Sequence, residues 1–373
     1  MVGHVVVIGA GVYGAAVAAG LASRGALVTV VEAGAPAGGT SSATFSWTNS
    51  CGKQPRSYHD LSVAGMLAHR RLAARVPHGD WYHEGGNLEW AATADGVDRL
   101  RRKVATVLEY GYAARWLTRA EVLALEPDLD PTALPADEVA YFPREGWVEP
   151  TRLVGHLLAT ALSRGARLLR DDAVVDLDID RTAAVRLTSG KRLTADAVVN
   201  CAGPHATRIA ALAGLDLPMR NTLGVLIYTS PVPVTVSRVV HAPDVHLRPD
   251  GGGRLLLHTS EVDAAATVSR GRTQVDQGAV DAVLSAGRDL YPGLRDATVE
   301  SVRVGERPIP ADGLPVLGRV ADLPAFHFAV SHSGATLSVH AGDLVAAEVL
   351  GENHDDTLGP FRYERFLPAL SAS

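Results

Sequence analysis

The stretch Val5-Val6-Val7-Ile8-Gly9-Ala10-Gly11-Val12-Tyr13-Gly14 decides the fold of this chain. Its first four residues are apolar and β-branched, which predicts a buried parallel strand. Glycines follow at once, and an alanine-rich segment over 15–23 then predicts a helix that Gly25 ends. A second apolar strand over 27–31 closes on Glu32. The order strand, glycine turn, helix, strand and acid is typical of a dinucleotide-binding βαβ unit.

Each position of this unit has a physical role. Gly9 permits the tight turn, Gly11 lets a pyrophosphate approach the backbone because it has no Cβ, and Gly14 lets helix and strand pack closely. The helix N-terminus offers free N–H groups and the positive end of its dipole to the phosphates. Glu32 can accept hydrogen bonds from a ribose 2′-OH and would repel a 2′-phosphate, which disfavours NADP. A plain glycine-rich turn is the alternative, and it would not require the other four features in this order.

Composition narrows the class of protein. A chain of 373 residues suggests two domains, possibly interleaved, and 47% hydrophobic with 20% charged residues is ordinary for a globular protein. The net charge of −6 does not indicate the basic surface that is typical of nucleic-acid-binding proteins. Two cysteines, Cys51 and Cys201, make no disulfide framework, and no metal-ligand spacing is present. Since no signal peptide or membrane-spanning run is evident, we expect a cytoplasmic protein without membrane, nucleic-acid or metal partners.

Three further stretches carry a family resemblance. Residues 38–43 read Gly-Gly-Thr-Ser-Ser-Ala, residues 305–318 read GERPIPADGLPVLG, and residues 331–337 read SHSGATL. Together with Gly9–Gly14 and Glu32, they resemble the D-amino-acid oxidase, glycine oxidase and sarcosine oxidase family of FAD flavoproteins. The resemblance covers essentially the whole chain. The chain departs from the family's usual pattern at Ser331 and Ala335, where glycines are common.

The resemblance implies an α/β fold (α+β overall), in which a Rossmann-like FAD-binding domain is interleaved with a β-rich antiparallel substrate domain. The FAD-binding domain is expected over 1–80, 146–220 and 305–373, and the substrate-binding domain over 81–145 and 221–304. Hydrophobic patterns add a long helix over 58–76, a β-rich run over 221–305 and a final helix over 339–350. A capping-box pattern at Thr118 and Glu121 predicts the start of a further helix.

The motifs and the resemblance together nominate the residues that contact FAD. They are Gly9, Gly11, Val12, Tyr13, Gly14, Glu32, Ala33, Thr40, Ser41, Ser42, Ser46, Val174, Cys201, Ala202, Gly203, Gly305, Arg307, Gly334, Ala335, Thr336 and Leu337. We expect non-covalent binding, because no cysteine lies near 305–340, where some relatives attach the cofactor. Cys201 is interpreted as a small buried residue rather than a redox group.

Candidate catalytic residues are basic or lie on the later strands. Arg307 matches the arginine that binds the substrate carboxylate in the amino-acid oxidases, where a guanidinium fork can make two hydrogen bonds. The alternative is that Arg307 pairs with a structural acid such as Glu306 or Asp312. Lys53 and Arg56 are candidates for binding an anionic substrate or activating oxygen, and solvated loop charges are the alternative.

Four side chains on the antiparallel strands could also reach the flavin. They are Tyr228, His241, His246 and His258. Because successive side chains of a strand alternate between its two faces, we expect one or two of the four to face the flavin. Tyr228 and His258 are included in the catalytic set.

The predicted function is an FAD-dependent oxidase of a small amine or amino acid. By resemblance, a hydride passes from the substrate C–H to flavin N5, the imine is hydrolysed, and O₂ is reduced to hydrogen peroxide. The alternative is an FAD-dependent dehydrogenase of a 2-hydroxy acid or other C–O substrate with a non-O₂ acceptor. A non-catalytic nucleotide-binding module is disfavoured by Glu32, Arg307 and the Gly334 loop. An NAD-only dehydrogenase is also disfavoured, because its second half would contain more βα units, whereas this chain continues with antiparallel strands. Substrate identity and oligomeric state stay open.

Overall fold

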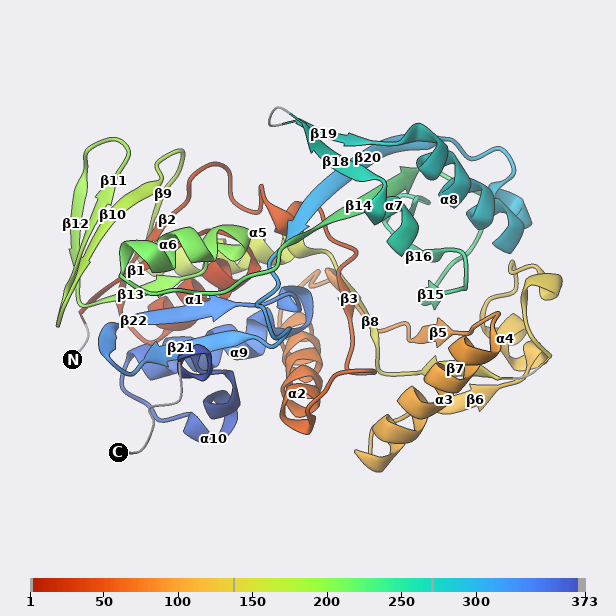
Figure 1. Cartoon of the computed structure of the whole chain (residues 1–373), viewed down its shortest axis with the longest axis horizontal. Coiled ribbons are helices and arrows are strands. Elements are labelled where there is room, and N and C mark those ends of the chain that lie inside the picture. Colours follow the sequence, from red (N-terminus) through yellow and green to blue (C-terminus); the bar gives the residue numbers. More distant parts are fainter. Residues whose placement is uncertain (1–2, 137, 270–271, 368–373) are drawn as a thin grey trace.

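The computed structural model describes residues 3–136, 138–269 and 272–367. Two large sheets lie side by side along the long axis of the molecule, with the chain crossing between them several times (Figure 1). The first and last strands of the chain belong to the same sheet, so both ends of the sequence build one half of the molecule.

The first sheet contains the dinucleotide-binding unit predicted from the sequence. In spatial order its strands are β21 (Val316–Val320), β22 (Leu323–Val330), β13 (Ala197–Asn200), β1 (His4–Ile8), β2 (Leu27–Val31) and β9 (Arg167–Leu169). All neighbours pair in parallel except β21, which is antiparallel to β22. β1 is almost continuously apolar because both faces of the sheet are covered.

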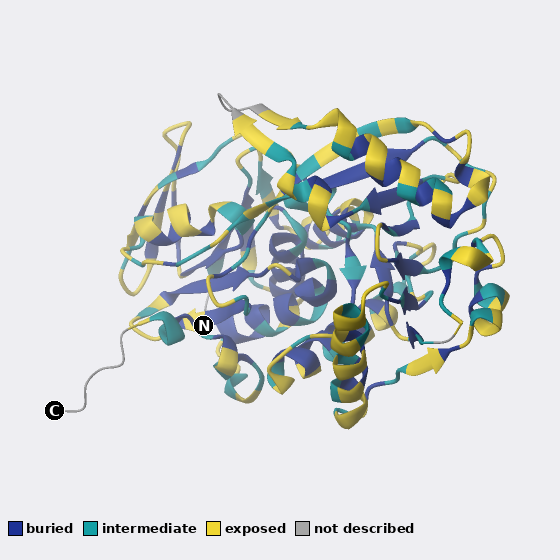
Figure 2. Cartoon of the chain, turned by 45° about the vertical axis from the view of Figure 1, so that its right-hand side comes forward, coloured by how far each residue is buried: buried dark blue, intermediate teal, exposed yellow. Residues whose placement is uncertain are grey.

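Each face of this sheet packs against a different layer. The side chains of Val5 and Val7 on β1 join a core with helices α1 (Val12–Ser23), α5 (Pro150–Leu162) and α9 (Gly334–Val349). Val6 and Ile8 point the other way, toward α6 (Ala206–Leu212) and the small sheet of β10 (Val174–Ile179), β11 (Ala183–Leu187) and β12 (Arg192–Ala195). Figure 2 shows the buried residues gathered between these layers.

The second sheet is mostly antiparallel. Its spatial order is β20 (Val299–Arg307), β14 (Thr222–Thr229), β17 (Leu255–His258), β16 (His246–Pro249), β15 (Val239–His241), β5 (Asn87–Glu89), β7 (Val139–Phe142) and β6 (Arg115–Leu117). A glycine turn at 251–253 joins β16 to β17. Its apolar face packs against α8 (Gln277–Leu290), and α3 (Ala94–Glu109) and α4 (Arg119–Leu125) lie at its far end (Figure 1).

A three-stranded sheet joins the two halves. It consists of β3 (Trp47–Thr48), β8 (Gly146–Val148) and β4 (Tyr82–His83). The fully buried Glu145 precedes β8 and accepts hydrogen bonds from the Ser50 and Cys51 amides at 3.0 and 2.8 Å, and from Trp47 Nε1 and Asn87 Nδ2 at 3.1 and 3.2 Å. One carboxylate thereby ties the loop after β3 to the edge of β5.

Several element boundaries differ from the prediction. The final helix begins at Gly334 rather than at residue 339, because Ser, Gly and Thr in its first turn hide the start of an apolar pattern. The long helix α2 is Arg56–Ala73 rather than 58–76. The short helix α7 (Ser260–Ala264) and the hairpin of β18 (Ala266–Ser269) and β19 (Arg272–Val275) were not predicted. The capping box of Thr118 and Glu121 is confirmed at the start of α4.

The two sheets suggest where domains divide. Strands from 81–145 and 221–304 build most of the antiparallel sheet, and β20 continues it to residue 307. We propose the same two-domain division as above, with β20 shared at the boundary.

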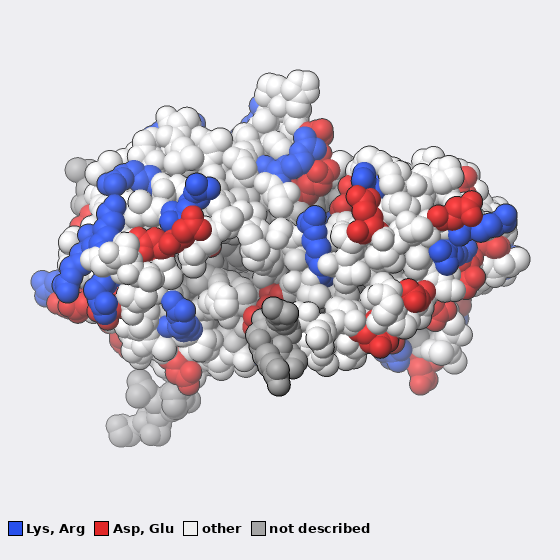
Figure 3. Space-filling view, turned by 90° about the horizontal axis from the view of Figure 1, so that it is seen from above, with Lys and Arg blue, Asp and Glu red and all other residues white. Residues whose placement is uncertain are grey.

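The surface carries both signs of charge. On the face in Figure 3, groups of Lys and Arg lie beside groups of Asp and Glu. Within the described ranges, no helix is long and apolar enough to cross a membrane. In the same residues, no group of three or more His, Cys, Asp or Glu side chains is arranged to hold a metal ion.

Candidate active site

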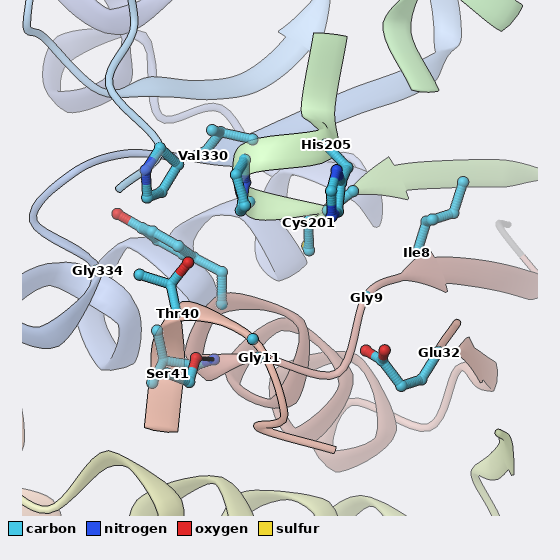
Figure 4. A pocket seen from close by; sticks show the side chains of 18 of the residues that line it. Ile8, Gly9, Gly11, Glu32, Thr40, Ser41, Cys201, His205, Val330 and Gly334 are labelled. Atoms are coloured by element: carbon cyan, nitrogen blue, oxygen red, sulfur yellow. Dashed lines mark hydrogen bonds between the residues drawn. The ribbon is translucent and has the colours of Figure 1, made fainter. Parts of the chain in front are cut away.

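A first cavity of ≈ 350 Å³ lies at the carboxyl ends of four parallel strands. Ile8 of β1, Val31 of β2 and Val330 of β22 line it, as does Cys201 directly after β13. Figure 4 shows Glu32 on one side of the Gly9 turn and Thr40 and Ser41 on the other. Ligands of open α/β sheets bind at this edge, outside the carboxyl ends of the strands.

The glycine turn forms a cradle that side chains would fill. Gly9 has a φ of +103°, a conformation that favours glycine. A Cβ on Gly11 would lie 3.0 Å from Ser41 Oγ. A Cβ on Gly14 would lie 1.8 Å from the Gly9 carbonyl oxygen, so this glycine sets the close contact between α1 and the turn. The backbone is thus open to a phosphate group, as the sequence predicted.

Glu32 is held in place at the rim of this cavity. Its Oε2 accepts a hydrogen bond from the Ala10 amide at 2.7 Å, and its Oε1 accepts one from the Gly34 amide at 2.9 Å. Each carboxylate oxygen has two lone-pair sites, so both can accept a further bond from a ribose hydroxyl. The carboxylate would repel a 2′-phosphate in the same position.

Two helices begin at the cavity. Val12, the first residue of α1, and Gly334 and Ala335, the first residues of α9, line its wall. The residues before the two helices, Gly11 and Ser333, make no side-chain cap hydrogen bond, although the Val12 amide donates to Ser41 Oγ at 3.2 Å. Their N–H groups and dipoles favour negative charge, which fits the pyrophosphate of a dinucleotide and a flavin that gains electrons.

Most residues predicted to contact FAD line the first cavity. They are Gly9, Gly11, Val12, Tyr13, Glu32, Ala33, Thr40, Ser41, Val174, Cys201, Ala202, Gly203, Gly334 and Ala335. The sequence prediction missed His205 and Arg208, which follow β13 and also line it. Neither residue belongs to a motif, and their position depends on how α6 packs beside β10.

Other predicted contacts lie elsewhere. Gly14 lies beneath the turn, and Ser42 donates its hydroxyl back to the Gly39 carbonyl at 3.0 Å. Gly305 packs against the Ala43 backbone. Thr336 donates to the Trp47 carbonyl at 3.4 Å, and Leu337 is fully buried in the core, because α9 has already begun by this point. Ser46 and Arg307 line a second cavity instead.

The second cavity, of ≈ 720 Å³, adjoins the first beneath the antiparallel sheet. Both cavities share lining residues from the loop after β2, from the end of β20 and from the start of α9: Thr40, Thr44, Pro308, His332 and Ala335. A ligand in the first cavity can therefore reach the second.

Three of the five predicted catalytic residues line the second cavity: Arg307, Lys53 and His258. Arg56 lines neither cavity, since it points outward from α2 and pairs with Asp60 at 3.4 Å. Tyr228 also lines neither. It lies two residues beyond the cavity-lining Leu226 on the same face of β14, where its ring contacts the Arg303 guanidinium.

Arg307 pairs with an acid that the sequence did not suggest. Its Nη2 lies 2.6 Å from Asp263 Oδ2, whereas Glu306 and Asp312 bond to other groups. The guanidinium also donates to the Leu223 carbonyl through Nη1 at 3.2 Å, and it lies over Gly224, where a Cβ would clash with it. Burial alone would raise the pKa of Asp263, but hydrogen bonds from His258 and the Val225 amide, with the charge of Arg307, lower that pKa overall.

Four imidazoles line the second cavity: His241, His246, His258 and His332. Three lie in series along neighbouring strands, since the ring centroid of His246 is 4.5 Å from that of His241 and 5.7 Å from that of His258. Burial lowers the pKa values of His246 and His332 to about 4 and lowers that of His241 well below its usual range, so these rings are neutral at pH 7. The sequence analysis expected one or two of Tyr228 and the three strand histidines to face the flavin. The register of distant strands brings all three histidines, and not Tyr228, to the second cavity.

Lys53 lies at the start of α9. Its Nζ donates to Ser333 Oγ at 2.8 Å, and the same hydroxyl bonds to Tyr58 OH at 2.6 Å. Ser333 precedes α9, so the ammonium group is held beside the helix N-terminus and next to the shared wall of the two cavities.

Comparisons with known proteins agree with this arrangement. A sequence profile for FAD dependent oxidoreductases matches residues 4–348. Glycine oxidase from Geobacillus kaustophilus is 30% identical over 97% of each chain. Hydrogen cyanide synthase subunit HcnC from Pseudomonas aeruginosa is 27% identical over 85% of this chain and 76% of its own.

Solved structures show the same fold. The crystal structure of glycine oxidase from Geobacillus kaustophilus matches with a TM-score of 0.87 at 28% identity, covering 98% of this chain and 99% of that one. Iminodiacetate oxidase from Chelativorans sp. BNC1 matches with a TM-score of 0.82 at 26% identity, covering 96% and 98%. Because the profile spans most of the chain, the protein belongs to the family of FAD-dependent oxidoreductases.

Proposed function

We propose that this protein is an FAD-dependent oxidase of a small amine or amino acid. The observation that carries the proposal is the junction of the two cavities. The first fits a dinucleotide, and the second places a guanidinium and four imidazoles next to it. Glycine oxidase and iminodiacetate oxidase, which match along nearly their whole length, are by name oxidases of such compounds.

FAD would be held non-covalently by backbone and by Glu32. The ribose hydroxyls would bond to the Glu32 carboxylate, and the pyrophosphate would lie against the Gly9–Gly14 turn and the hydroxyls of Thr40 and Ser41. When bound, FAD supplies the electron acceptor for oxidation of a C–H bond next to an amine nitrogen. The N-terminus of α9 would stabilise the negative charge of that acceptor after reduction.

Arg307 would bind the carboxylate of an amino-acid substrate. A guanidinium has five N–H donors, and Leu223 and Asp263 engage only two of its nitrogens in single contacts. The remaining donors can hold a carboxylate and so fix the neighbouring carbon near the cofactor.

Lys53 would assist the reaction with O₂, because a fixed positive charge favours the negative charge that oxygen gains. Cytoplasmic location stays a prediction.

The test is oxygen consumption by the FAD-loaded protein with D- and L-amino acids, N-methyl amines and 2-hydroxy acids. We expect hydrogen peroxide in equal amount to a carbonyl product, with an amine as substrate. Turnover of a 2-hydroxy acid alone, or turnover only with an artificial acceptor in place of O₂, would contradict the proposal and support the dehydrogenase alternative.

A further inference from the structure

One imidazole of the second cavity differs from the other three in having a carboxylate partner. His258, the last residue of β17, places Nε2 2.9 Å from Asp263 Oδ2. Arg307 Nη2 approaches the same oxygen to 2.6 Å and lies 3.0 Å from His258 Nε2. The side chains of His258 and Asp263 are only 12% and 13% exposed, so this pair is largely shielded from solvent.

The cluster fixes the tautomer of His258. An ionised carboxylate only accepts hydrogen bonds, and a guanidinium only donates them. Asp263 is ionised beside Arg307, so a neutral His258 donates its Nε2–H to Asp263 Oδ2. Arg307 Nη2 donates to the same oxygen. The lone pair of the imidazole is then on Nδ1, and no hydrogen-bond partner for Nδ1 is present among the described residues.

The charged and titratable groups around His258 come from three neighbouring elements. Asp263 on α7 attracts the imidazolium, Arg307 on β20 opposes it, and His246 on β16 is neutral. His241 lies beyond His246 and is also neutral. Neither His241 nor His246 has a carboxylate within ion-pair distance in the described part of the chain.

We propose that His258 is the proton acceptor for the substrate amine and that Asp263 is the residue that positions it. The inference rests on the proposed function, because an amine has to lose its ammonium proton before oxidation at the neighbouring carbon. In this step the N–H bond of the ammonium group breaks, the proton passes to His258 Nδ1, and the electron pair stays on the amine nitrogen. Asp263 then stabilises the imidazolium. A carboxylate on Arg307 and an amine at His258 match the two neighbouring groups of an α-amino acid.

The first test does not depend on turnover. Protein labelled with ¹⁵N-histidine is titrated by NMR, and the His258 signal is assigned by its loss in His258→Gln. We expect the Nε2–H tautomer for neutral His258 in the wild type. In Asp263→Ala we expect a larger share of the Nδ1–H tautomer, because the acceptor of the Nε2–H is removed and Arg307 Nη2 can then donate to Nε2. An Nδ1–H tautomer in the wild type, or a tautomer ratio that Asp263→Ala leaves unchanged, would overturn the proposal.

The second test is the pH dependence of anaerobic flavin reduction by glycine, N-methylglycine and iminodiacetate. An alkylammonium group has a pKa of about 10, so without a base the rate follows the small neutral fraction of the amine. We expect His258→Gln to be slower by about 100-fold at pH 7 and to approach the wild-type rate near pH 10. A loss of equal size at every pH would show a merely structural role and overturn the proposal.

His246→Gln is the matched control, since it changes an imidazole of the same wall that has no acidic partner. It is expected to leave the shape of the pH profile unchanged. If none of the three probes reduces the wild-type flavin, the proposed function fails for amines, whereas the NMR titration still decides whether Asp263 controls His258.

Discussion

Glu145 shows what a single buried carboxylate does in this fold. It accepts backbone N–H groups from the loop after β3 and side-chain N–H groups from Trp47 and Asn87. Asn87 in turn accepts a hydrogen bond from His241 Nδ1 at 2.8 Å, so the network extends to the wall of the second cavity. Desolvation outweighs these bonds and raises the pKa of Glu145 from 4.5 to about 7.

This raised pKa predicts a pH-dependent stability. The folded state holds the Glu145 proton between pH 4.5 and about 7, whereas the unfolded state releases it, so stability falls as the pH rises through this window. We expect the free energy of unfolding of the wild type, relative to Glu145→Gln, to fall by about 3 kcal/mol from pH 4.5 to pH 7. Urea unfolding of both proteins at several pH values measures it, and a constant difference would contradict the prediction.

Glu32 provides a second prediction at the scale of one residue. Replacement by Ala removes the carboxylate that holds the Ala10 and Gly34 amides and that would bind the ribose. We expect the Kd of the apoprotein for FAD to rise by about 10- to 100-fold, the effect of losing a charged hydrogen-bond acceptor. Quenching of FAD fluorescence measures the Kd. Glu109→Ala, at the exposed end of α3, is the control, and equal affinity of the two variants would contradict the assignment.

Sequence reasoning at this scale was limited by distance along the chain. Glu32, Lys53 and Arg307 lie in or next to recognisable motifs, and they could be nominated without a structure. Asp263 could not, because its role depends on α7 packing beside β14 and on the register of β14 with β20. Glu145 was missed for the same reason, since its partners come from three separate segments.

At the scale of elements, α1 and α5 offer a matched pair of helical glycines. A Cβ at Gly14 would lie 1.8 Å from a backbone oxygen that cannot move independently, whereas a Cβ at Gly155 meets no atom within 4 Å. We expect Gly14→Ala to lower the unfolding free energy by about 3 kcal/mol and to weaken FAD binding. Gly155→Ala should stabilise the protein by about 1 kcal/mol, since alanine favours a helix.

Thermal unfolding with and without FAD checks this pair. Equal effects of the two substitutions would contradict the close contact between α1 and the glycine turn. The βαβ unit could be predicted from the sequence because its strand, turn and helix are contiguous. Its glycines stand where the local backbone leaves no room for a side chain. The start of α9 could not be predicted, because Gly334, Ala335 and Thr336 in its first turn interrupt the apolar pattern.

At the scale of the whole molecule, a buried ion pair ties the end of the chain to the first sheet. Arg362 Nη1 lies 2.7 Å from Glu348 Oε2, and the Glu348 side chain is only 2% exposed. The same oxygen accepts a hydrogen bond from the Arg319 amide on β21 at 2.8 Å. Phe361, next to this arginine, is fully buried in the core with α1 and α9. The C-terminal segment therefore completes the first half of the molecule.

Removing one partner of this pair is expected to destabilise the fold. Arg362→Ala would leave the Glu348 charge buried without its partner, and we expect a loss of about 3 kcal/mol in unfolding free energy. Arg254→Ala is the control, because Arg254 and Glu300 form a largely exposed pair at 2.6 Å that contributes about 1 kcal/mol or less. Chemical denaturation compares the two variants, and similar losses would contradict the structural role of the buried pair.

The division of the molecule into two sheets followed from the sequence, because motifs at both ends and antiparallel patterns between them are each locally visible. The chemistry of the second cavity was harder to predict. The cavity is lined by side chains from strands between β14 and β20, from the loop before α2 and from the start of α9. Only folding brings Lys53, His258 and Arg307 to one space.

We propose that the two cavities together make an amine-oxidising flavin site. The most direct measurement is the absorbance of the FAD-loaded protein in one anaerobic cuvette, before and after addition of glycine, N-methylglycine or iminodiacetate, and again after air is admitted. We expect loss of the oxidised flavin spectrum with at least one amine and its return in air with release of hydrogen peroxide. A spectrum that only 2-hydroxy acids change, or a protein that does not bind FAD, would contradict it.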